Sequence, residues 1–343
     1  MSEWLIYRGT GEPHDGMDRI PAPPPWRKFD GGPLVEPPEG IGTASTRRLG
    51  VNAGGARLHR PRAEELELIN AALYLRRPLL VTGDPGSGKS TIAHAVAHEL
   101  GLGRVLYWPV VSRTSLQDGL YRYDAIARLQ DVQLARTEPA LEAGGESDPA
   151  AAIGRYVRLG PLGTALLPNK HPRVLLVDEL DKSDIDLPND LLNVLEEGEF
   201  AIPELERIAD RVPEVQVLSD DGRRVTVRDG RVRCAAFPFI VLTSNGERDF
   251  PAPLLRRCIH LQLPPPDRER LAAMVRAHFG ETPGGTRTAD EIIEMFLDRP
   301  SGEVRAADQL LNAIYLAQIA APEDLGARTR IAEQLMQPLD RTR

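Results

Sequence analysis

The sequence predicts an α/β fold in which helices cover both faces of a parallel β-sheet, followed by a small all-helical domain. The first observation is a set of five short apolar runs that do not alternate with polar residues, at 79–81, 105–107, 174–177, 239–242 and 259–261. Such runs, when separated by helical segments, are typical of strands buried on both faces of a parallel sheet. The second observation is that only helical spacing follows the three prolines at 264–266.

Composition limits the class of protein further. The chain has 343 residues, which is enough for about two domains. Its 42 Lys and Arg against 50 Asp and Glu give a net charge of −8, which argues against broad coating of nucleic acid. Two cysteines are too few for a disulfide scaffold, no apolar run approaches the roughly 20 residues of a membrane span, and the first residues lack a signal-peptide pattern. We therefore expect a cytoplasmic protein.

The N-terminal segment differs from the rest of the chain. Residues 1–56 are rich in proline and glycine, with eight prolines between positions 13 and 38. This composition cannot sustain helices or central strands. It fits either a disordered tail or an extended arm that packs on its own domain or on a neighbouring subunit. Trp4, Trp26 and Phe29 favour the arm, because disordered tails are poor in aromatic residues.

The helices are expected in the following order. Residues 62–75 have helical spacing, with Leu66, Ile69 and Leu73 on one face. After the last strand, Asp267 can cap a helix, residues 288–291 form a capping box before another, and Ser301 opens a third. We divide the chain into an arm at 1–56, an α/β domain at 57–265 and a helical lid domain at 266–343.

The strongest motif lies at residues 83–90, which fit the pattern G-x-x-x-x-G-K-[ST]. A predicted strand precedes it and a predicted helix follows. The glycines let backbone N–H groups close around phosphate oxygens, and the helix N-terminus favours an anion. We expect Lys89 to neutralise the β- and γ-phosphates of ATP and the Ser90 hydroxyl to ligate Mg²⁺. The candidate nucleotide-binding residues are Gly83, Asp84, Pro85, Gly86, Ser87, Gly88, Lys89, Ser90 and Thr91.

Two further polar groups follow predicted strands. Asp178 and Glu179 come directly after the strand at 174–177, at the sheet edge where ligands of open α/β sheets bind. Downstream of a phosphate loop, such a pair indicates nucleotide hydrolysis, with Asp178 at the metal and Glu179 polarising the attacking water. Asn245 follows the strand at 239–242. If that strand lies between the other two, its amide can orient the water or contact the γ-phosphate.

Adjacent arginines, Arg256 and Arg257, precede the last predicted strand. Such a pair is usually a solvated corner. In oligomeric NTPases an arginine here reaches the γ-phosphate of the neighbouring subunit and stabilises charge in the transition state. We favour Arg257 for this role, with Arg256 assisting.

These signals, in this order, resemble the AAA+ ATPases over residues 57–320, and finer features resemble their MoxR branch. Residues 111–114 and 118–124 are similar to its insertion within the second helix, and residues 215–232 to its pre-sensor β-hairpin; 159–162 and 185–200 also match. The resemblance implies a magnesium-dependent ATPase that assembles as a hexameric ring. It also implies chaperone-like remodelling of a partner protein, which in this branch often has a von Willebrand A domain. Arg305 stands where the family has its lid arginine, near the γ-phosphate.

The predicted hairpin at 215–232 has a polar tip between two strands of alternating valines. Alternating valines at 215–227 predict that one face of the hairpin packs on the body and that its polar tip, 220–224, projects toward a partner.

One rival function is a nucleic-acid motor or loader of the same superfamily. Its predicted pore segments carry arginines without interleaved aromatic residues. The other rival is a nucleotide-gated scaffold with negligible turnover, against which Glu179, Asn245 and Arg257 argue together.

Overall fold

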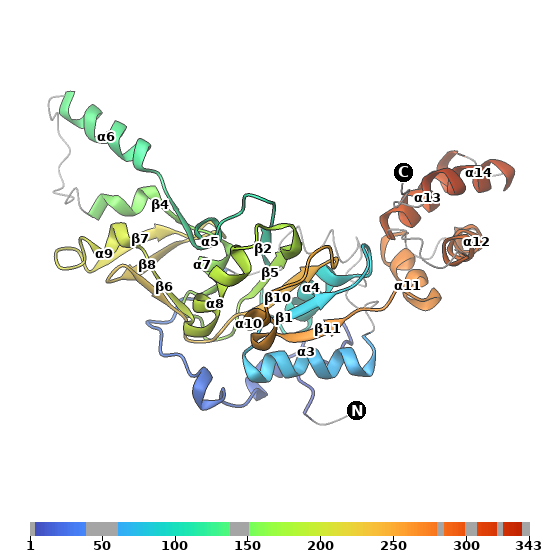
Figure 1. The fold of residues 1–343 in the computed structure, drawn as a ribbon, viewed down its shortest axis with the longest axis horizontal. Helices are drawn as coiled ribbons and strands as arrows, with labels where there is room; N and C mark the ends of the chain where they lie inside the picture. The colour runs from blue at the N-terminus through green and yellow to red at the C-terminus, as the bar shows by residue number, and fades with distance from the viewer. Residues whose placement is uncertain are drawn as a thin grey trace.

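A five-stranded parallel sheet, which we call sheet A, lies at the centre of the molecule (Figure 1). The structure is a computed structural model, and it describes residues 4–38, 61–137, 151–279, 285–298, 307–320 and 325–337. All five runs predicted as strands belong to sheet A. Its strands are, in spatial order, β11 (Ile259–Gln262), β1 (Leu79–Thr82), β10 (Phe239–Ser244), β5 (Val174–Asp178) and β2 (Leu106–Pro109).

Both faces of sheet A are buried. Alternate residues of the three central strands, β1, β10 and β5, join two different apolar clusters, so that Leu79 and Val81 lie in one cluster and Leu80 lies in the other. Helices α3 (Ala63–Leu75) and α4 (Lys89–Glu99) contribute to the first cluster. The second cluster includes residues of α7 (Pro161–Ala165), α8 (Leu187–Glu197) and α10 (Ala252–Arg257). The predicted arrangement, a parallel sheet with helices on both faces, is therefore confirmed.

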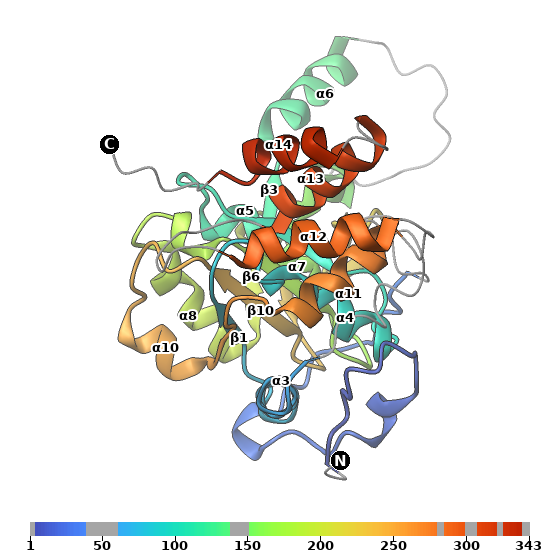
Figure 2. The same cartoon turned by 90° about the vertical axis from the view of Figure 1, so that its right-hand side faces the viewer.

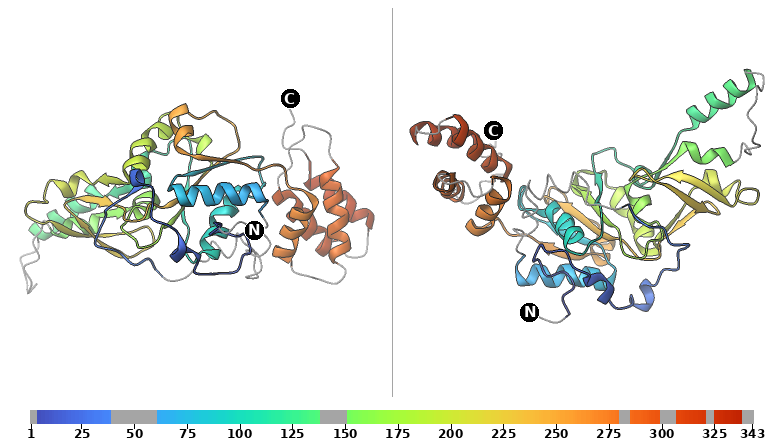
Figure 3. Two further views of the ribbon diagram at one scale, coloured as in Figure 1. Left: turned by 90° about the horizontal axis from the view of Figure 1, so that it is seen from below. Right: turned by 180° about the vertical axis from the view of Figure 1, so that it is seen from behind.

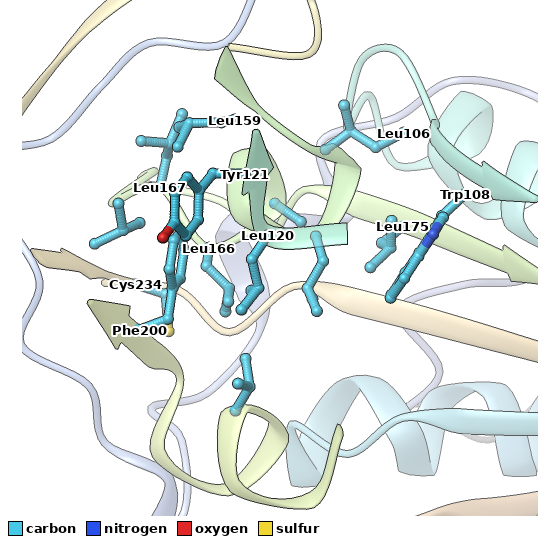
Figure 4. Close-up of a cluster of buried hydrophobic side chains, with 14 of the residues drawn as sticks. Leu106, Trp108, Leu120, Tyr121, Leu159, Leu166, Leu167, Leu175, Phe200 and Cys234 are labelled. Carbon is cyan, nitrogen blue, oxygen red and sulfur yellow. The ribbon is translucent and has the colours of Figure 1, made fainter. Parts of the chain in front are cut away.

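A second, six-stranded sheet packs beside sheet A, and we call it sheet B. Its order is β3 (Tyr121–Tyr123), β4 (Val157–Leu159), β7 (Glu214–Leu218), β8 (Arg224–Arg228), β9 (Arg231–Arg233) and β6 (Glu199–Ala201). The two sheets share one apolar cluster. Figure 4 shows Leu106, Trp108 and Leu175 of sheet A together with Tyr121 and Phe200 of sheet B. The Tyr121 and Phe200 rings are stacked with their centroids 6.4 Å apart.

The first two residues of the β7–β8 hairpin tip, Asp220 and Asp221, are docked on the body, so the prediction that the whole tip projects is wrong for these two residues. Asp221 forms an ion pair with Arg173 at 2.9 Å, and the two side chains are only 4% and 3% exposed. The backbone N–H of Asp220 donates a hydrogen bond to Thr164 Oγ1 at 2.8 Å. Asp220 and Asp221 therefore have partners inside the protein, whereas Gly222, Arg223 and Arg224 are exposed. The polarity of the two aspartates alone could not distinguish those partners from water.

Helices surround sheet B and extend from it. Two short helices, α5 (Leu116–Leu120) and α9 (Pro203–Glu206), lie against it, and the 3-10 turn η3 (Ala151–Tyr156) packs on β7. A further 3-10 turn, η4 (Leu180–Lys182), follows β5 and contacts β10 of sheet A. Helix α6 (Ala125–Thr137) begins directly after the residues predicted as the insertion, 111–114 and 118–124, and extends away from the body (Figure 1). Its Ile126 and Leu129 are 71% and 60% exposed.

The N-terminal arm, which we define as residues 4–38, packs on its own domain. It contains the 3-10 turns η1 (Gly16–Arg19) and η2 (Pro25–Arg27) and crosses one side of the molecule (Figure 3). The backbone N–H groups of Ile6 and Tyr7 donate to Asn70 Oδ1 of α3 at 2.7 and 2.9 Å. The buried carboxylate of Glu99, at the end of α4, accepts from the backbone N–H of Arg8 and Gly11. A disordered tail is therefore excluded for these residues, because their backbone is tied to two helices of the body.

The C-terminal region is helical, as predicted, and Figure 2 looks onto it. Its helices are α11 (Arg268–Phe279), α12 (Gly285–Leu297), α13 (Ala307–Ala320) and α14 (Leu325–Leu335). They share a third apolar cluster that includes Leu271, Ile293, Phe296 and Leu310. Among the described residues of the whole chain, no helix combines the length and apolar character needed to cross a membrane.

Candidate functional site

The loop between β1 and α4 forms a backbone cradle at the C-terminal edge of sheet A. Gly86 and Gly88 have φ angles of 77° and 90°, a region that glycine enters without steric cost. Gly88 caps α4, whose first backbone N–H groups have no partner within the helix. These groups and the helix dipole make the loop suited to an anion. The predicted nucleotide-binding residues, 83–91, all lie in this loop and in the first turn of α4.

Lys89 lies within the cradle. The residue is 8% exposed, and Nζ donates hydrogen bonds to the carbonyl oxygens of Gly83 and Asp84 at 2.7 and 2.8 Å. Burial lowers the pKa of Lys89, and Asp181 opposes that shift more than any other nearby carboxylate. The loop thus holds the Lys89 ammonium against two backbone carbonyls. A bound phosphate group can take the place of these carbonyls as the hydrogen-bond acceptor for Lys89.

Asp178 is the meeting point of three elements. Ser90 Oγ, on α4, donates a hydrogen bond to Asp178 Oδ1 at 2.7 Å. Thr243 Oγ1, on β10, donates to the same oxygen at 2.7 Å. Tyr107, on β2, reaches Asp178 Oδ2 at 3.2 Å. The structure therefore brings together the two predicted metal ligands, Ser90 and Asp178. It adds Thr243 and Tyr107, which the sequence analysis assigned no role.

Those oxygen atoms suit magnesium. A hydroxyl and a carboxylate are hard oxygen ligands, and Mg²⁺ usually takes one or two from a protein and the rest from phosphates and water. Among the described residues, no group of three or more His, Cys, Asp or Glu side chains could hold a metal ion without such help. Ser90 and Asp178 therefore fit an ion that arrives with a nucleotide.

Glu179 stands one residue beyond β5 in a left-handed backbone conformation, with φ 62° and ψ 49°. Its backbone N–H donates to Thr243 Oγ1 at 2.9 Å. Its carboxylate forms an ion pair with Lys182 at 2.8 Å, with side-chain exposures of 43% and 41%. Thr243 thus fixes the Asp178 carboxylate and the Glu179 backbone, while the Glu179 side chain stays partly open to solvent.

Asn245 follows β10, which lies between β1 and β5 as the sequence analysis required. Its backbone N–H donates to Asp181 Oδ2 at 2.9 Å. The loop that carries Asn245 is therefore joined to the turn that carries Glu179. Asp181 is a third residue that motif reasoning missed, after Thr243 and Tyr107.

The predicted arginines lie at the opposite edge of sheet A. Arg257 Nε contacts Glu196 Oε2 of α8 at 3.0 Å, and Arg256 accepts a hydrogen bond on its carbonyl from Arg77. Both end α10, which leads into β11. Because Ile259 of β11 pairs with Leu79 at the start of β1, these arginines lie at the strand end remote from the cradle. They are therefore not part of the cluster formed by their own chain.

The C-terminal helices approach the cradle directly. A Cβ atom on Gly86 would collide with the backbone nitrogen of Ala307, the first residue of α13. A Cβ on Gly83 would meet the carbonyl oxygen of Leu263, at 2.6 Å. The cradle thus lies against both the linker after β11 and the start of α13. Arg305, the predicted lid arginine, lies outside the described residues.

Known proteins show two similarities to this chain. Among solved structures, the chain is similar to NtrX from Brucella abortus, determined in complex with ADP, with 15% sequence identity and a TM-score of 0.43. That similarity covers 86% of this chain, which spans 58% of the length of the NtrX chain. The family model described as AAA domain (dynein-related subfamily) matches residues 78–258. This match takes in more than half of the sequence, and the chain therefore belongs to the dynein-related subfamily of AAA domains.

Proposed function

We propose that this protein is a magnesium-dependent ATPase of MoxR type that works as a ring, hexameric in size, and remodels a partner protein. One observation carries the proposal. Lys89, Ser90 and Asp178 bring a cation, a hydroxyl and a carboxylate to one helix N-terminus, with Ser90 and Asp178 2.7 Å apart. Membership of the AAA domains supports nucleotide binding and assembly into oligomers. The division into an α/β domain at 57–265 and a lid at 266–343 belongs to the same proposal.

The cradle residues bind the triphosphate. Backbone N–H groups of residues 83–91, other than Pro85, surround the phosphate oxygens, and Lys89 exchanges its carbonyl partners for the β- and γ-phosphates. Ser90 and Asp178 would hold Mg²⁺, which when bound would withdraw charge from the phosphate oxygens. Thr243 and Tyr107 keep the Asp178 carboxylate in place.

Glu179 polarises the attacking water, and Asn245 orients it. The ion pair of Glu179 with Lys182 does not prevent this role, because a pair this exposed is worth about 0–1 kcal/mol. The carboxylate can therefore turn to a water molecule beside the γ-phosphate. Arg305 contributes positive charge near the γ-phosphate from the lid. Arg257 of a neighbouring subunit, assisted by Arg256, supplies positive charge on the outer side of the γ-phosphate.

The proposal of a partner protein rests on the resemblance to the MoxR branch alone. We propose a protein partner, one with a von Willebrand A domain, whose conformation changes as the lid moves during hydrolysis. Helix α6 and sheet B supply surfaces beyond the nucleotide site for such a partner (Figure 1).

Two substitutions test the ATPase. Lys89→Ala should abolish ATP binding, because the backbone cradle alone cannot offset the charge of the triphosphate. Glu179→Gln should bind ATP normally and hydrolyse it about 10²–10⁴-fold more slowly, since only activation of the water is lost. Nucleotide titration and a phosphate-release assay measure the two effects. Lys170→Ala and Glu67→Gln, at exposed positions, serve as controls. Parental turnover by Glu179→Gln would show that another residue is the base.

A further inference from the structure

Asp181 is a buried carboxylate that joins two parts of the candidate site. It lies in η4, two residues after Glu179, and is 4% exposed. Its Oδ2 accepts hydrogen bonds from the backbone N–H of Asn245 at 2.9 Å and of Glu247 at 3.1 Å. Its Oδ1 is also buried and has no hydrogen-bond partner among the described residues. The side chain therefore directs its hydrogen bonding to a single target, the loop after β10.

Burial of the Asp181 carboxylate has an energetic cost that its neighbours must offset. Burying a carboxylate is costly unless hydrogen bonds and nearby charge compensate for the lost water. Two charge-assisted bonds to backbone N–H groups supply part of that compensation. Lys89 supplies nearby positive charge. Burial lowers the pKa of Lys89, and Asp181 is the carboxylate that most raises it again, so the two charges attract each other. A neutral side chain would hold the loop less firmly, so the charge itself has a structural consequence.

The loop that Asp181 holds carries Asn245, and the turn that bears Asp181 also bears Glu179. Both are predicted to act on the same water molecule, from the ends of neighbouring strands β10 and β5. Their separation therefore depends on how the loop is fixed to the turn. A misplacement of about 1 Å in such a pair can cost about 10²-fold in rate.

We propose that Asp181 is a positioning residue for hydrolysis, which sets the backbone of Asn245 relative to Glu179. This inference rests on the proposed function. It assigns Asp181 no contact with the nucleotide. Its effect passes through Asn245 and falls on the hydrolysis step, while ATP binding is left intact.

The sign of the effect on binding separates positioning from simple destabilisation. Asp181→Asn removes a negative charge near Lys89, so ATP should bind as tightly as before or more tightly. Turnover should nevertheless fall about tenfold, because an amide oxygen accepts more weakly than a carboxylate. Asp184→Asn, an exposed neighbour in the same segment, should change neither quantity. A parallel loss of affinity and turnover, together with a lower melting temperature, would contradict the positioning role.

A double-substitution experiment tests the route of the effect. If Asp181 acts through Asn245, Asp181→Asn should cost about tenfold in the parental background and nothing further beside Asn245→Ala. Equal losses in both backgrounds would overturn the inference. Amide hydrogen exchange gives a readout without activity: exchange at Asn245 and Glu247 should accelerate in Asp181→Asn, and unchanged exchange would also overturn it. Absence of ATP turnover in the parental protein would instead refute the proposed function.

Discussion

Arg27 shows how one residue of the arm can hold several elements together. It is 4% exposed although it is charged. Its guanidinium donates hydrogen bonds to the carbonyl oxygens of Arg76, Leu195 and Glu196, which lie at or next to the C-terminal ends of α3 and α8. It also lies over the ring of Phe237, with Cζ 4.3 Å from the centroid. Helix C-termini carry unpaired carbonyls and partial negative charge, so a buried cation is well placed there.

Replacing Arg27 should therefore destabilise the whole domain. Arg27→Ala leaves buried carbonyls without donors, and we expect a loss of about 3 kcal/mol in the free energy of unfolding. Arg27→Lys should recover only part of this, because an ammonium cannot reproduce the planar set of donors. Urea denaturation measures both, with the exposed Lys28→Ala as the control. A loss below about 1 kcal/mol for Arg27→Ala would show that the arm is dispensable for stability.

At the scale of residues, the sequence predicted those whose role follows from local spacing. Lys89 and Ser90 are fixed by the loop and helix that contain them, and Asp178 by its place at the end of an apolar run. Thr243 and Asp181 could not be found in this way. Their contacts with Asp178 and Asn245 exist only because β10 lies between β1 and β5. A threonine in a strand, or an aspartate in a turn, carries no signal of that arrangement.

At the scale of elements, length decided what could be predicted. The strands of sheet A contain four to six residues each, and all of them except β11 contain an uninterrupted apolar run. The strands β3, β4 and β6 contain three residues each, which is too short for a periodic pattern to emerge. The resemblance to the MoxR branch predicts the β7–β8 hairpin, and the alternation of its valines predicts which face packs on the body. The docking of Asp220 and Asp221 was not predicted, because a polar side chain can be paired inside the protein or solvated.

The docked tip gives a matched pair of tests within one hairpin. Asp221 and Arg173 are 4% and 3% exposed, whereas Glu214 and Arg228 are 55% and 51% exposed at a similar distance, 2.9 Å. Asp221→Ala leaves a buried guanidinium unpaired and should cost about 3–5 kcal/mol. Glu214→Ala should cost at most about 1 kcal/mol, because water screens the exposed pair. Equal losses in thermal or urea unfolding would mean that the tip is not held against the body in solution.

At the scale of the whole molecule, the proposed function takes an arginine from a neighbouring subunit. The described residues of the cluster supply a phosphate cradle, Lys89, two oxygen ligands and Glu179. Arg257 lies at the other end of sheet A, in an exposed ion pair with Glu196. It therefore cannot serve its own cradle without unfolding α10. Its half-exposed position, at the end of a helix packed on α8, suits a residue that reaches a second copy of the chain.

The trans arrangement makes a prediction about mixtures of subunits. Arg257→Ala should bind ATP normally and hydrolyse it poorly, because an arginine that stabilises transition-state charge in trans is worth about 10³–10⁵ in turnover. Lys89→Ala should not bind ATP. Each variant alone is then inactive for a different reason. In a mixed ring, an intact Lys89 site can meet an intact Arg257 from its neighbour, so part of the activity should return on mixing.

The proportion of active interfaces can be varied to sharpen this test. If assembly is random, one interface in four has both residues intact at equal concentrations, and activity should follow the product of the two subunit fractions. A doubly substituted chain, Lys89→Ala with Arg257→Ala, provides the control, because mixing it with either single variant creates no complete site. Phosphate release is measured after native mass spectrometry has confirmed mixed assemblies. Mixed rings that remain inactive, or monomers that hydrolyse ATP as fast as assemblies, would place the missing cation within the chain and return Arg257 to a purely structural role beside Glu196.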